Sequence, residues 1–469
     1  MRIFNSLTRK VEDFEPMKPP VVKMYTCGPT VYNYPTIGNW RTYVTSDLLV
    51  RALKYTNHKV DFVMNLTDVG HLVSDGDTGE DKLEKGARRE GKSAWEVARF
   101  YTEDFLKGFS KLNLTKPMLF SKATDHIKEQ IELVEQIEKA GFTYKTSDGI
   151  YFDVAKYESA GNKYGQLSSL DEIREGARVE VNTEKNDPRD FALWKFSPKN
   201  EKRDMEWSSP WGMGFPGWHI ECSAMSMKYL GEQLDIHVGG EDLMPIHHPN
   251  EVAQSEAATG KKPFSKYWVH GAFLLVDGGK MGKSLGNAYT LEDIEKRGFE
   301  ALALRYFFLT AHYRKQLNFT WESLKAGFSA LEKLRMAMVT FRESGKRTQL
   351  SAEKLQKIDD FRIEFGKAID DDLNMPNALA VIFEVVKSNI PEYDKYELIE
   401  NFDEVLGLDL ANYYYRKFEA GPELLALLEK REKFRLARNF AEADKVRGEI
   451  ESRGFQINDM PEGAKLVRK

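Results

Sequence analysis

The order of hydrophobic and polar positions near the start of the chain predicts a parallel β-sheet with a helical crossover. Residues 21–27, VVKMYTC, form a short apolar run typical of a buried strand. Residues 38–54 carry apolar side chains at a helical period, and residues 59–66, KVDFVMNL, alternate as a second strand. A strand, a helix and a strand within about 45 residues form a βαβ unit, whose two strands must be parallel.

The pattern changes twice further along the chain. Residues 125–205 are rich in turn-forming and charged residues, which indicates an insertion between two halves of the sheet. Strand-like and helical segments return at 218–275, and beyond about residue 325 the chain is charged and helical. We therefore predict an α/β fold, with a Rossmann-like parallel-sheet catalytic domain, an insertion, and an all-α C-terminal region.

Composition limits the kinds of partner and location. The chain has 469 residues, 41% of them hydrophobic and 30% charged, which indicates a globular protein of several domains. The net charge is −5, so a nucleic-acid partner needs a local basic surface. The last part of the chain, 411–469, has 13 Lys+Arg against 10 Asp+Glu. Its candidate phosphate contacts are Arg431, Arg435, Arg438 and Arg447.

The two cysteines, Cys27 and Cys222, cannot make a disulfide framework, which leaves apolar thiols, a catalytic thiol or metal ligands. The N-terminal segment lacks the apolar core of a secretory signal, and no run of about 18 apolar residues occurs. We therefore expect a cytoplasmic protein without a membrane span.

Four residues make a candidate metal site. His247 and Glu251 are four apart, so a helix that contains Pro249 in its first turn places both side chains on one face. Cys27 ends a predicted strand, where sites of parallel sheets form, and Cys222 lies near a predicted helix start. Two thiolates, an imidazole and a carboxylate suit zinc. Their spacing alone does not identify the site, and buried thiols with a surface His–Glu pair remain the alternative.

Two segments could bind a nucleotide. Thr36, Gly38 and Asn39 begin the first predicted helix, where backbone amides and the helix dipole favour phosphate. Lys280 and Lys283 lie in GGKMGKSLGN, a glycine-rich loop after the strand-like FLLV, and could contact a triphosphate. An ordinary helix start and an ordinary surface loop remain the alternatives.

Taken together and in this order, the segments resemble one enzyme family. Pro29–Asn39, within TCGPTVYNYPTIGN, and Lys280–Ser284, KMGKS, resemble the two signatures of class I aminoacyl-tRNA synthetases. The first has the form found in cysteinyl-tRNA synthetases. GWHIECSAM and HHPNEVAQSE resemble the zinc and cysteine-binding segments of the same family, and the resemblance extends over essentially the whole chain.

The resemblance implies functional roles for particular residues. It implies a zinc ion with the ligands Cys27, Cys222, His247 and Glu251. It further implies that Thr67 and Trp218 lie in the amino-acid pocket with His237 nearby. For ATP it implies contacts by Lys283 with Lys280 in the same loop, near the first signature residues Thr36, Gly38 and Asn39.

Two residues depart from the family pattern. Thr36 stands where the first signature usually begins with histidine, and Gly282 stands where the second usually has serine. Threonine keeps a hydrogen-bond donor but lacks the reach of the imidazole, and glycine makes the loop more flexible. Both departures bear on the rate of activation more than on the function.

The resemblance also implies a division into six regions. These are the first half of the catalytic domain (1–125), a connective insertion (126–205), the second half with the zinc site (206–270), a signature-loop and stem-contact region (271–325), a helical bundle (326–415) and an anticodon-recognition region (416–469).

The implied activity is that of a cysteinyl-tRNA synthetase, a ligase that acts in protein biosynthesis. It converts L-cysteine and ATP, with Mg²⁺, to cysteinyl-adenylate and transfers the aminoacyl group to the 3′ end of tRNA(Cys). Zinc would select the thiolate of cysteine over the hydroxyl of serine. The family further suggests a monomer.

Three other readings remain open. A ligase that passes activated cysteine to an amino-sugar would share the catalytic half, but it would not need the helical part after residue 325. A degenerate synthetase that only binds zinc or nucleic acid would account for Thr36 and Gly282. A generic α/β nucleotide-binding enzyme would account for the βαβ pattern alone.

Overall fold

The chain divides into two compact units, Met1–Ala411 and Asn412–Lys469. The computed structural model describes residues 1–70, 81–168, 183–198, 203–282, 285–345, 349–413, 422–460 and 463–468. Among these residues, no helix is long and apolar enough to cross a membrane.

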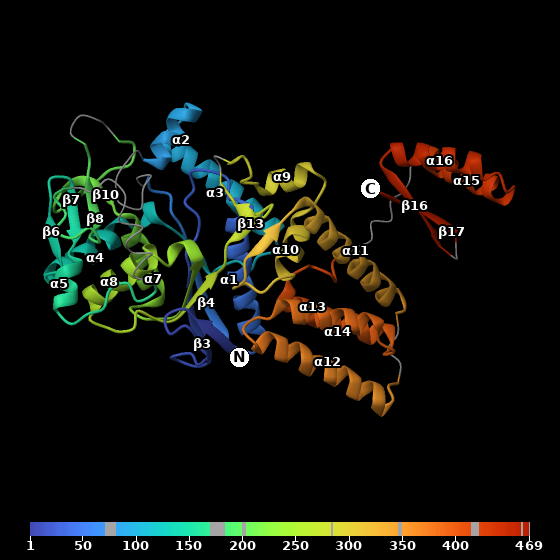
Figure 1. Cartoon of the computed structure of the whole chain (residues 1–469), viewed down its shortest axis with the longest axis horizontal. Helices are drawn as coiled ribbons and strands as arrows, with labels where there is room; N and C mark the ends of the chain where they lie inside the picture. Colours follow the sequence, from blue (N-terminus) through green and yellow to red (C-terminus); the bar gives the residue numbers. More distant parts are fainter. Residues whose placement is uncertain are drawn as a thin grey trace. The chain divides into compact units, whose positions relative to one another are not determined.

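A five-stranded parallel sheet forms the centre of the first unit (Figure 1). Its strands, in spatial order, are β12 (Ser265–Gly271), β11 (Leu234–Gly240), β3 (Val21–Thr26), β4 (Lys59–Leu66) and β5 (Leu119–Lys122). Helix α1 (Ile37–Tyr55) connects β3 to β4, so the predicted βαβ unit is confirmed. The strand order changes direction between β3 and β11, and this is where parallel sheets form their binding crevices.

Helix α1 begins at a capping box. Thr36 accepts a hydrogen bond from the amide of Asn39, and the Asn39 side chain accepts one from the amide of Thr36 at 2.9 Å. Two further helices, α2 (Lys82–Glu90) and α3 (Ala94–Lys111), follow β4. The buried ring of Trp40 on α1 stacks on Phe105 of α3 at 5.3 Å between centroids. This apolar packing holds α1 in place, and the N-terminus of α1 faces the crevice at the carboxyl ends of the strands.

The insertion has a sheet of its own. Its antiparallel strands run in the order β6 (Thr143–Lys145), β7 (Gly149–Phe152), β8 (Phe191–Phe196), β10 (Gly212–Pro216) and β9 (Trp207–Ser209). Helices α4 (Ile127–Lys139) and α5 (Val154–Ser159) accompany it. Because β9 and β10 pair with this sheet, it extends to Pro216, whereas the predicted division of regions lies at 205 and 206.

The chain then returns to the central sheet through α7 (Trp218–Leu230) and α8 (His247–Thr259). A small sheet of β13 (Leu274–Val276), β14 (Gly279–Lys280) and β15 (Leu317–Phe319) follows, together with α9 (Leu291–Lys296) and α10 (Ala301–Leu309). The first unit also contains an N-terminal hairpin, β1 (Arg2–Asn5) and β2 (Lys10–Asp13).

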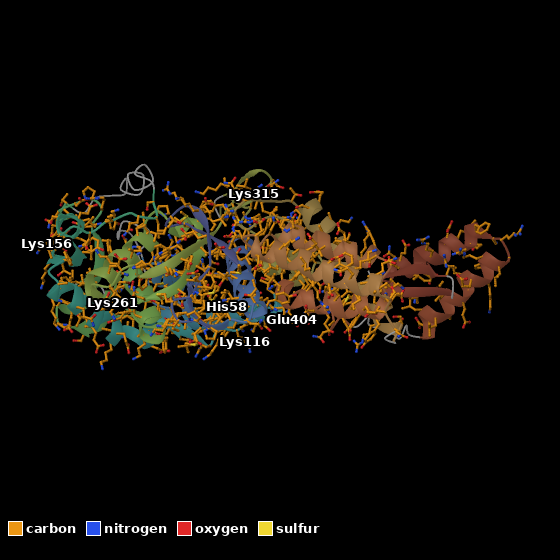
Figure 2. All side chains as sticks on the ribbon, turned by 90° about the horizontal axis from the view of Figure 1, so that it is seen from below. His58, Lys116, Lys156, Lys261, Lys315 and Glu404 are labelled. Atoms are coloured by element: carbon orange, nitrogen blue, oxygen red, sulfur yellow. The ribbon has the colours of Figure 1, made fainter. Side chains whose placement is uncertain are left out.

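A bundle of four helices follows the small sheet. It contains α11 (Trp321–Glu343), α12 (Ala352–Asp370), α13 (Met375–Lys387) and α14 (Glu392–Leu406) (Figure 1). Arg305 of α10 is fully buried and donates to the carbonyl of Leu406 at 2.7 Å and to Asp47 of α1 at 2.5 Å. The bundle is therefore tied to the central domain by buried polar contacts. Exposed lysines such as Lys156 and Lys315 lie on separate parts of the surface (Figure 2).

The second unit contains α15 (Pro422–Leu436), α16 (Phe440–Ser452) and a hairpin of β16 (Phe455–Met460) and β17 (Gly463–Arg468). The predicted helices are confirmed, but the expectation of an all-α region missed this hairpin. Its core includes Ile450 and Ile457. Arg431, which we expected to be an available cation, is 3% exposed and pairs with Glu432 at 2.8 Å.

Candidate active site

The carboxyl end of β3 and two helices bring the four predicted metal ligands together. Cys27 follows β3, Cys222 lies on α7, and His247 and Glu251 lie on the first turns of α8. All four are buried, and one donor atom of each lies within 4.8 Å of the others. The Sγ atoms of the two cysteines are 3.8 Å apart, Cys27 Sγ is 3.6 Å from Glu251 Oε1, and this oxygen is 3.0 Å from His247 Nε2.

These distances fit a zinc ion. Ligands of a tetrahedral zinc ion lie at about 2.3 Å for sulfur and about 2.0 Å for nitrogen or oxygen, so two sulfurs are about 3.8 Å apart and a sulfur and an oxygen about 3.5 Å. The spacing of the two thiols matches the first value, and that of Cys27 and Glu251 is within 0.1 Å of the second. The donor set of two sulfurs, one imidazole and one carboxylate is also one that zinc prefers.

A second group of donors overlaps the first. Cys27, His237, His248 and Glu251 also have donor atoms within 4.8 Å of one another. The imidazole of His237, on β11, reaches the other oxygen of Glu251 at 2.9 Å, and His248 Nδ1 lies 2.7 Å from His270 Nε2. Both imidazoles thus have partners that orient them around the first group. Sequence reasoning missed His248, although the pair HH in HHPNE was a signal.

The ligand candidates have strongly shifted pKa values. Burial disfavours the imidazolium, but hydrogen bonds and the charges of Cys222 and Glu251 outweigh it and raise the pKa of His247 to about 10. A hydrogen bond from Cys27, opposed by burial and assisted by His247, lowers the pKa of Cys222 to about 7. Burial raises the pKa of Cys27 well above its ordinary value. One thiolate is therefore available near neutral pH, as a metal ligand requires.

Two of the three residues expected in the amino-acid pocket contact this cluster, and the third contacts the residue before Cys222. The ring of Trp218 is 4.5 Å from that of His247, between centroids. Thr67, just after β4, donates to Oε2 of Glu221 at 3.1 Å. His237 is fully buried and contacts Glu251. Sequence reasoning missed Glu221, because nothing in the sequence distinguishes a buried glutamate from a surface one.

A separate pocket contains most of the residues expected to bind ATP. It is lined by Thr36, Gly38 and Asn39 of the α1 terminus, by Lys280 of β14, and by residues 271–275 with Gln316. A Cβ on Gly38 would lie 2.5 Å from Cε of Met281, so this glycine keeps the pocket open. Lys283 and Ser284 lie outside the described residues.

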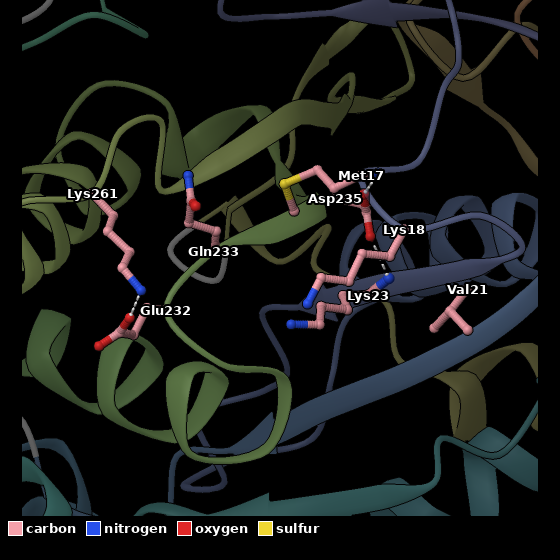
Figure 3. A pocket seen from close by; sticks show the side chains of 8 residues that line it. All are labelled: Met17, Lys18, Val21, Lys23, Glu232, Gln233, Asp235 and Lys261. Atoms are coloured by element: carbon pink, nitrogen blue, oxygen red, sulfur yellow. Dashed lines mark hydrogen bonds and ion pairs between the residues drawn. The ribbon is translucent and has the colours of Figure 1, made fainter.

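Another pocket lies at the opposite end of the strands, near the starts of β3 and β11 (Figure 3). It contains Lys18 and Lys23, and a Lys261–Glu232 ion pair spans its other side. Parallel sheets place their active sites at the carboxyl ends of the strands. The cluster and the pocket around Thr36 meet that condition, and the pocket in Figure 3 does not.

Comparison with known proteins identifies the class first. Residues 13–329 match the model of the class I (C) tRNA synthetase catalytic domain, and residues 364–389 match the DALR domain. The fold also resembles Mycobacterium tuberculosis methionyl-tRNA synthetase in complex with methionyl-adenylate, with a TM-score of 0.56 at 15% identity over 83% of this chain and 90% of that one. The fold and the site thus define a class I tRNA synthetase.

Relatives of known function specify the family. The chain is 45% identical to cysteine–tRNA ligase 1 of Burkholderia lata, over 99% of this chain and 96% of the relative. It is 40% identical to the cysteine–tRNA ligase of Treponema denticola, over 98% of both chains. The chain belongs to the cysteine–tRNA ligase family of class I tRNA synthetases.

Proposed function

We propose that this chain activates L-cysteine with ATP and transfers the cysteinyl group to the 3′ end of tRNA(Cys). The observation that carries the proposal is the buried cluster of Cys27, Cys222, His247 and Glu251, whose spacing suits zinc. Membership of the cysteine–tRNA ligase family supports the same substrates. A monomeric state, a cytoplasmic location and the six-region division remain predictions.

The cluster would hold one zinc ion and admit the substrate beside it. Zinc bound there would coordinate the substrate's thiolate, for which a serine hydroxyl is a poor substitute at neutral pH. His237 holds one oxygen of Glu251, which leaves the other directed at His247. Trp218 and Thr67 would enclose the body of the amino acid, because they flank the cluster from α7 and the end of β4.

The neighbouring pocket would bind ATP with Mg²⁺. The amides at the start of α1 would bind phosphate oxygens, and Asn39 would add a polar side chain. Lys280, exposed on β14, would neutralise charge as pyrophosphate leaves, together with Lys283. In this arrangement the protein positions the reactants and stabilises charge, and these two effects lower most of the barrier to phosphoryl transfer.

The alternatives fit the chain less well. An amino-sugar ligase has no use for the bundle α11–α14 and the second unit, whereas cysteine–tRNA ligases match this chain over nearly their whole length. A degenerate, non-catalytic protein has no reason to keep a complete donor set at zinc spacing beside an open nucleotide pocket.

Pyrophosphate exchange into ATP tests the proposal. Protein of known zinc content is assayed with cysteine and with serine, before and after zinc removal, and then for charging of tRNA(Cys). Exchange that needs cysteine, rejects serine and disappears with zinc is the expected result. Absence of cysteine-dependent exchange from folded, zinc-loaded protein would overturn the proposal.

A further inference from the structure

A buried arginine lies directly behind the wall of the proposed ATP pocket. Arg41 is on α1, two residues after Asn39, and is 3% exposed. Its Nη1 donates to the carbonyls of Ala272 and Phe273, each at 2.8 Å. Its Nη2 donates to the carbonyls of Lys315 at 2.5 Å and His312 at 3.3 Å. One guanidinium thus joins α1 to two segments far away in the sequence.

Both segments form part of the pocket. Ala272, Phe273 and Gln316 line it directly, and Lys315 immediately precedes Gln316. A backbone hydrogen bond from Ala272 to Tyr313, at 2.9 Å, joins the two segments to each other. The first signature reaches the pocket from the same helix as Arg41. The guanidinium therefore sets the distance between the signature residues and the opposite wall.

The contacts of Arg41 are unusual for a buried cation. The acceptors of these four hydrogen bonds are all backbone carbonyls, and none is a carboxylate. The nearby Glu241 accepts from the amide of Phe273 at 3.2 Å. Burying a guanidinium costs desolvation free energy, which an apolar side chain of the same size would avoid. An arginine at this position therefore suggests that the geometry of its hydrogen bonds is needed. Only the planar fork of arginine can hold four acceptors from separate segments.

We infer that Arg41 is a positioning residue for ATP: it fixes the pocket wall at 271–273 and the loop at 312–316 against the N-terminus of α1. Arg41 itself does not line the pocket. It acts through the backbone segments that it holds, which do line the pocket. The inference rests on the proposed function, because it assumes that this pocket binds ATP during cysteine activation. Displacing positioning groups by about 1 Å can cost up to about a hundredfold in rate.

The chain offers a matched control on the same helix. Arg51 also donates to two backbone carbonyls, those of Asn113 at 2.6 Å and Glu404 at 3.1 Å, and it pairs with Asp47. It lines no part of the nucleotide pocket. Replacing either arginine removes hydrogen bonds to backbone carbonyls of distant segments, so a loss of stability alone would appear in both variants.

The experiment measures cysteine-dependent pyrophosphate exchange in wild type, Arg41→Lys, Arg41→Met and Arg51→Met, with ATP and cysteine varied separately. For Arg41→Met we expect the KM for ATP to rise about tenfold or more, with the KM for cysteine unchanged. Arg41→Lys, which keeps the charge and part of the bonding, should give a smaller rise. Arg51→Met should keep the KM of wild type for ATP.

Unchanged ATP KM values in both Arg41 variants would overturn the inference. An equal rise in the KM for ATP and for cysteine would also overturn it, because it would indicate general damage. Should Arg41→Met not fold, Arg41→Lys decides by the same two constants. Wild type without cysteine-dependent exchange would instead reject the proposed function, so the two failures are distinguishable.

Discussion

The imidazoles of His219 and His247 meet through their Nδ1 atoms, which are 2.9 Å apart and buried. His247 Nε2 points the other way, toward Glu251 Oε1 at 3.0 Å. An imidazole that ligates metal through one nitrogen is usually oriented by a hydrogen bond at the other. His219 therefore fixes the orientation of His247 within the cluster, and Gln254 in turn donates to the backbone carbonyl of His219.

Removing this support should weaken the metal site without destroying the fold. For His219→Leu we expect zinc affinity to fall about 10–100-fold, the effect typical of outer-shell partners. His219→Gln, which can still hydrogen-bond, should recover part of the loss. Competition with a chromophoric chelator measures the affinity. Wild-type affinity in His219→Leu would contradict the assignment.

Direct ligands should have a larger effect than their supports. In His247→Ala and Glu251→Ala we expect zinc content and cysteine-dependent exchange to be lost together. The loss of zinc affinity should exceed the about 10–100-fold expected for residues that only orient a ligand. The matched control is Glu256→Gln, which is buried on the same helix but bonded to the amide of Phe264 at 3.1 Å, away from the cluster. Metal analysis and exchange are measured on the same preparations. A zinc-free but fully active His247→Ala protein would refute the metal's role.

Three glycines give a graded series. A Cβ on Gly28 would lie 1.8 Å from the carbonyl oxygen of Asn65, which is backbone and cannot move aside, so Gly28→Ala should fold poorly. On Gly38 its one close neighbour would be the mobile end of Met281, so Gly38→Ala should fold but bind ATP more weakly. Gly366, within α12, has nothing within 4 Å, and Gly366→Ala should gain up to about 1 kcal/mol of stability.

Thermal unfolding and the KM for ATP distinguish the three variants. We expect Tm to fall for Gly28→Ala, to change little for Gly38→Ala and to rise slightly for Gly366→Ala. Only Gly38→Ala should raise the KM for ATP among the variants that fold. A normal Tm for Gly28→Ala would show that the approach of the strand end to Asn65 is not obligatory.

Periodicity predicted the elements that carry the site. The apolar run before Cys27 and the helical period after Thr36 predicted strand β3 and helix α1 to within a residue. Both patterns are clear because β3 is a buried strand of the sheet and α1 is a largely buried helix. The i, i+4 spacing of His247 and Glu251 correctly placed them on one helix face. Residue types made Cys27 and Cys222 candidate ligands of one site, but only family resemblance implied that they share it, since a contact between residues 195 positions apart leaves no local pattern.

Other features had no local signal. The sequence-based view missed the hairpin β16–β17, in which Phe455 and Ile457 alternate with polar residues over only a few positions. It missed His270, which becomes relevant only because β12 places it 2.7 Å from His248. It also gave no role to Arg41, because four carbonyl acceptors are backbone groups that any sequence would supply.

The carboxylate of Asp47 lies between two guanidinium groups at the junction of the central domain and the bundle. Its Oδ2 accepts from Arg305 at 2.5 Å and from Arg51 at 2.8 Å, and its Oδ1 accepts from the amide of Thr115 at 2.7 Å. Burial favours the neutral acid, but the two cations and the hydrogen bonds outweigh it and hold the pKa of Asp47 below its ordinary value.

This pKa predicts a pH dependence of stability. A carboxyl with a lower pKa in the folded state binds fewer protons there, so its contribution is complete above the unfolded pKa of about 3.9 and is lost as pH falls toward the folded value. Asp47→Asn removes, at every pH, the negative charge that the buried Arg305 contacts directly. At pH 7 we therefore expect the free energy of unfolding to fall by about 3–5 kcal/mol. Below about pH 4 the difference should narrow, because the unfolded wild-type chain then binds a proton at Asp47 that the folded state binds only at lower pH.

Denaturant unfolding of wild type and Asp47→Asn measures this difference. The pH range runs from about 3.5 to about 7, so that it includes the unfolded pKa of about 3.9. Asp360→Asn is the control, because Asp360 is an exposed aspartate on α12 that accepts from Gln356 at 2.9 Å. It should change stability little at any pH, since exposed polar contacts contribute weakly. A gap between wild type and Asp47→Asn that stays constant down to the lowest pH would mean that Asp47 is not held ionised by Arg305. The junction would then depend on the hydrogen bonds of Arg305 to the backbone carbonyls of Leu406 and Leu112 instead of on its charge.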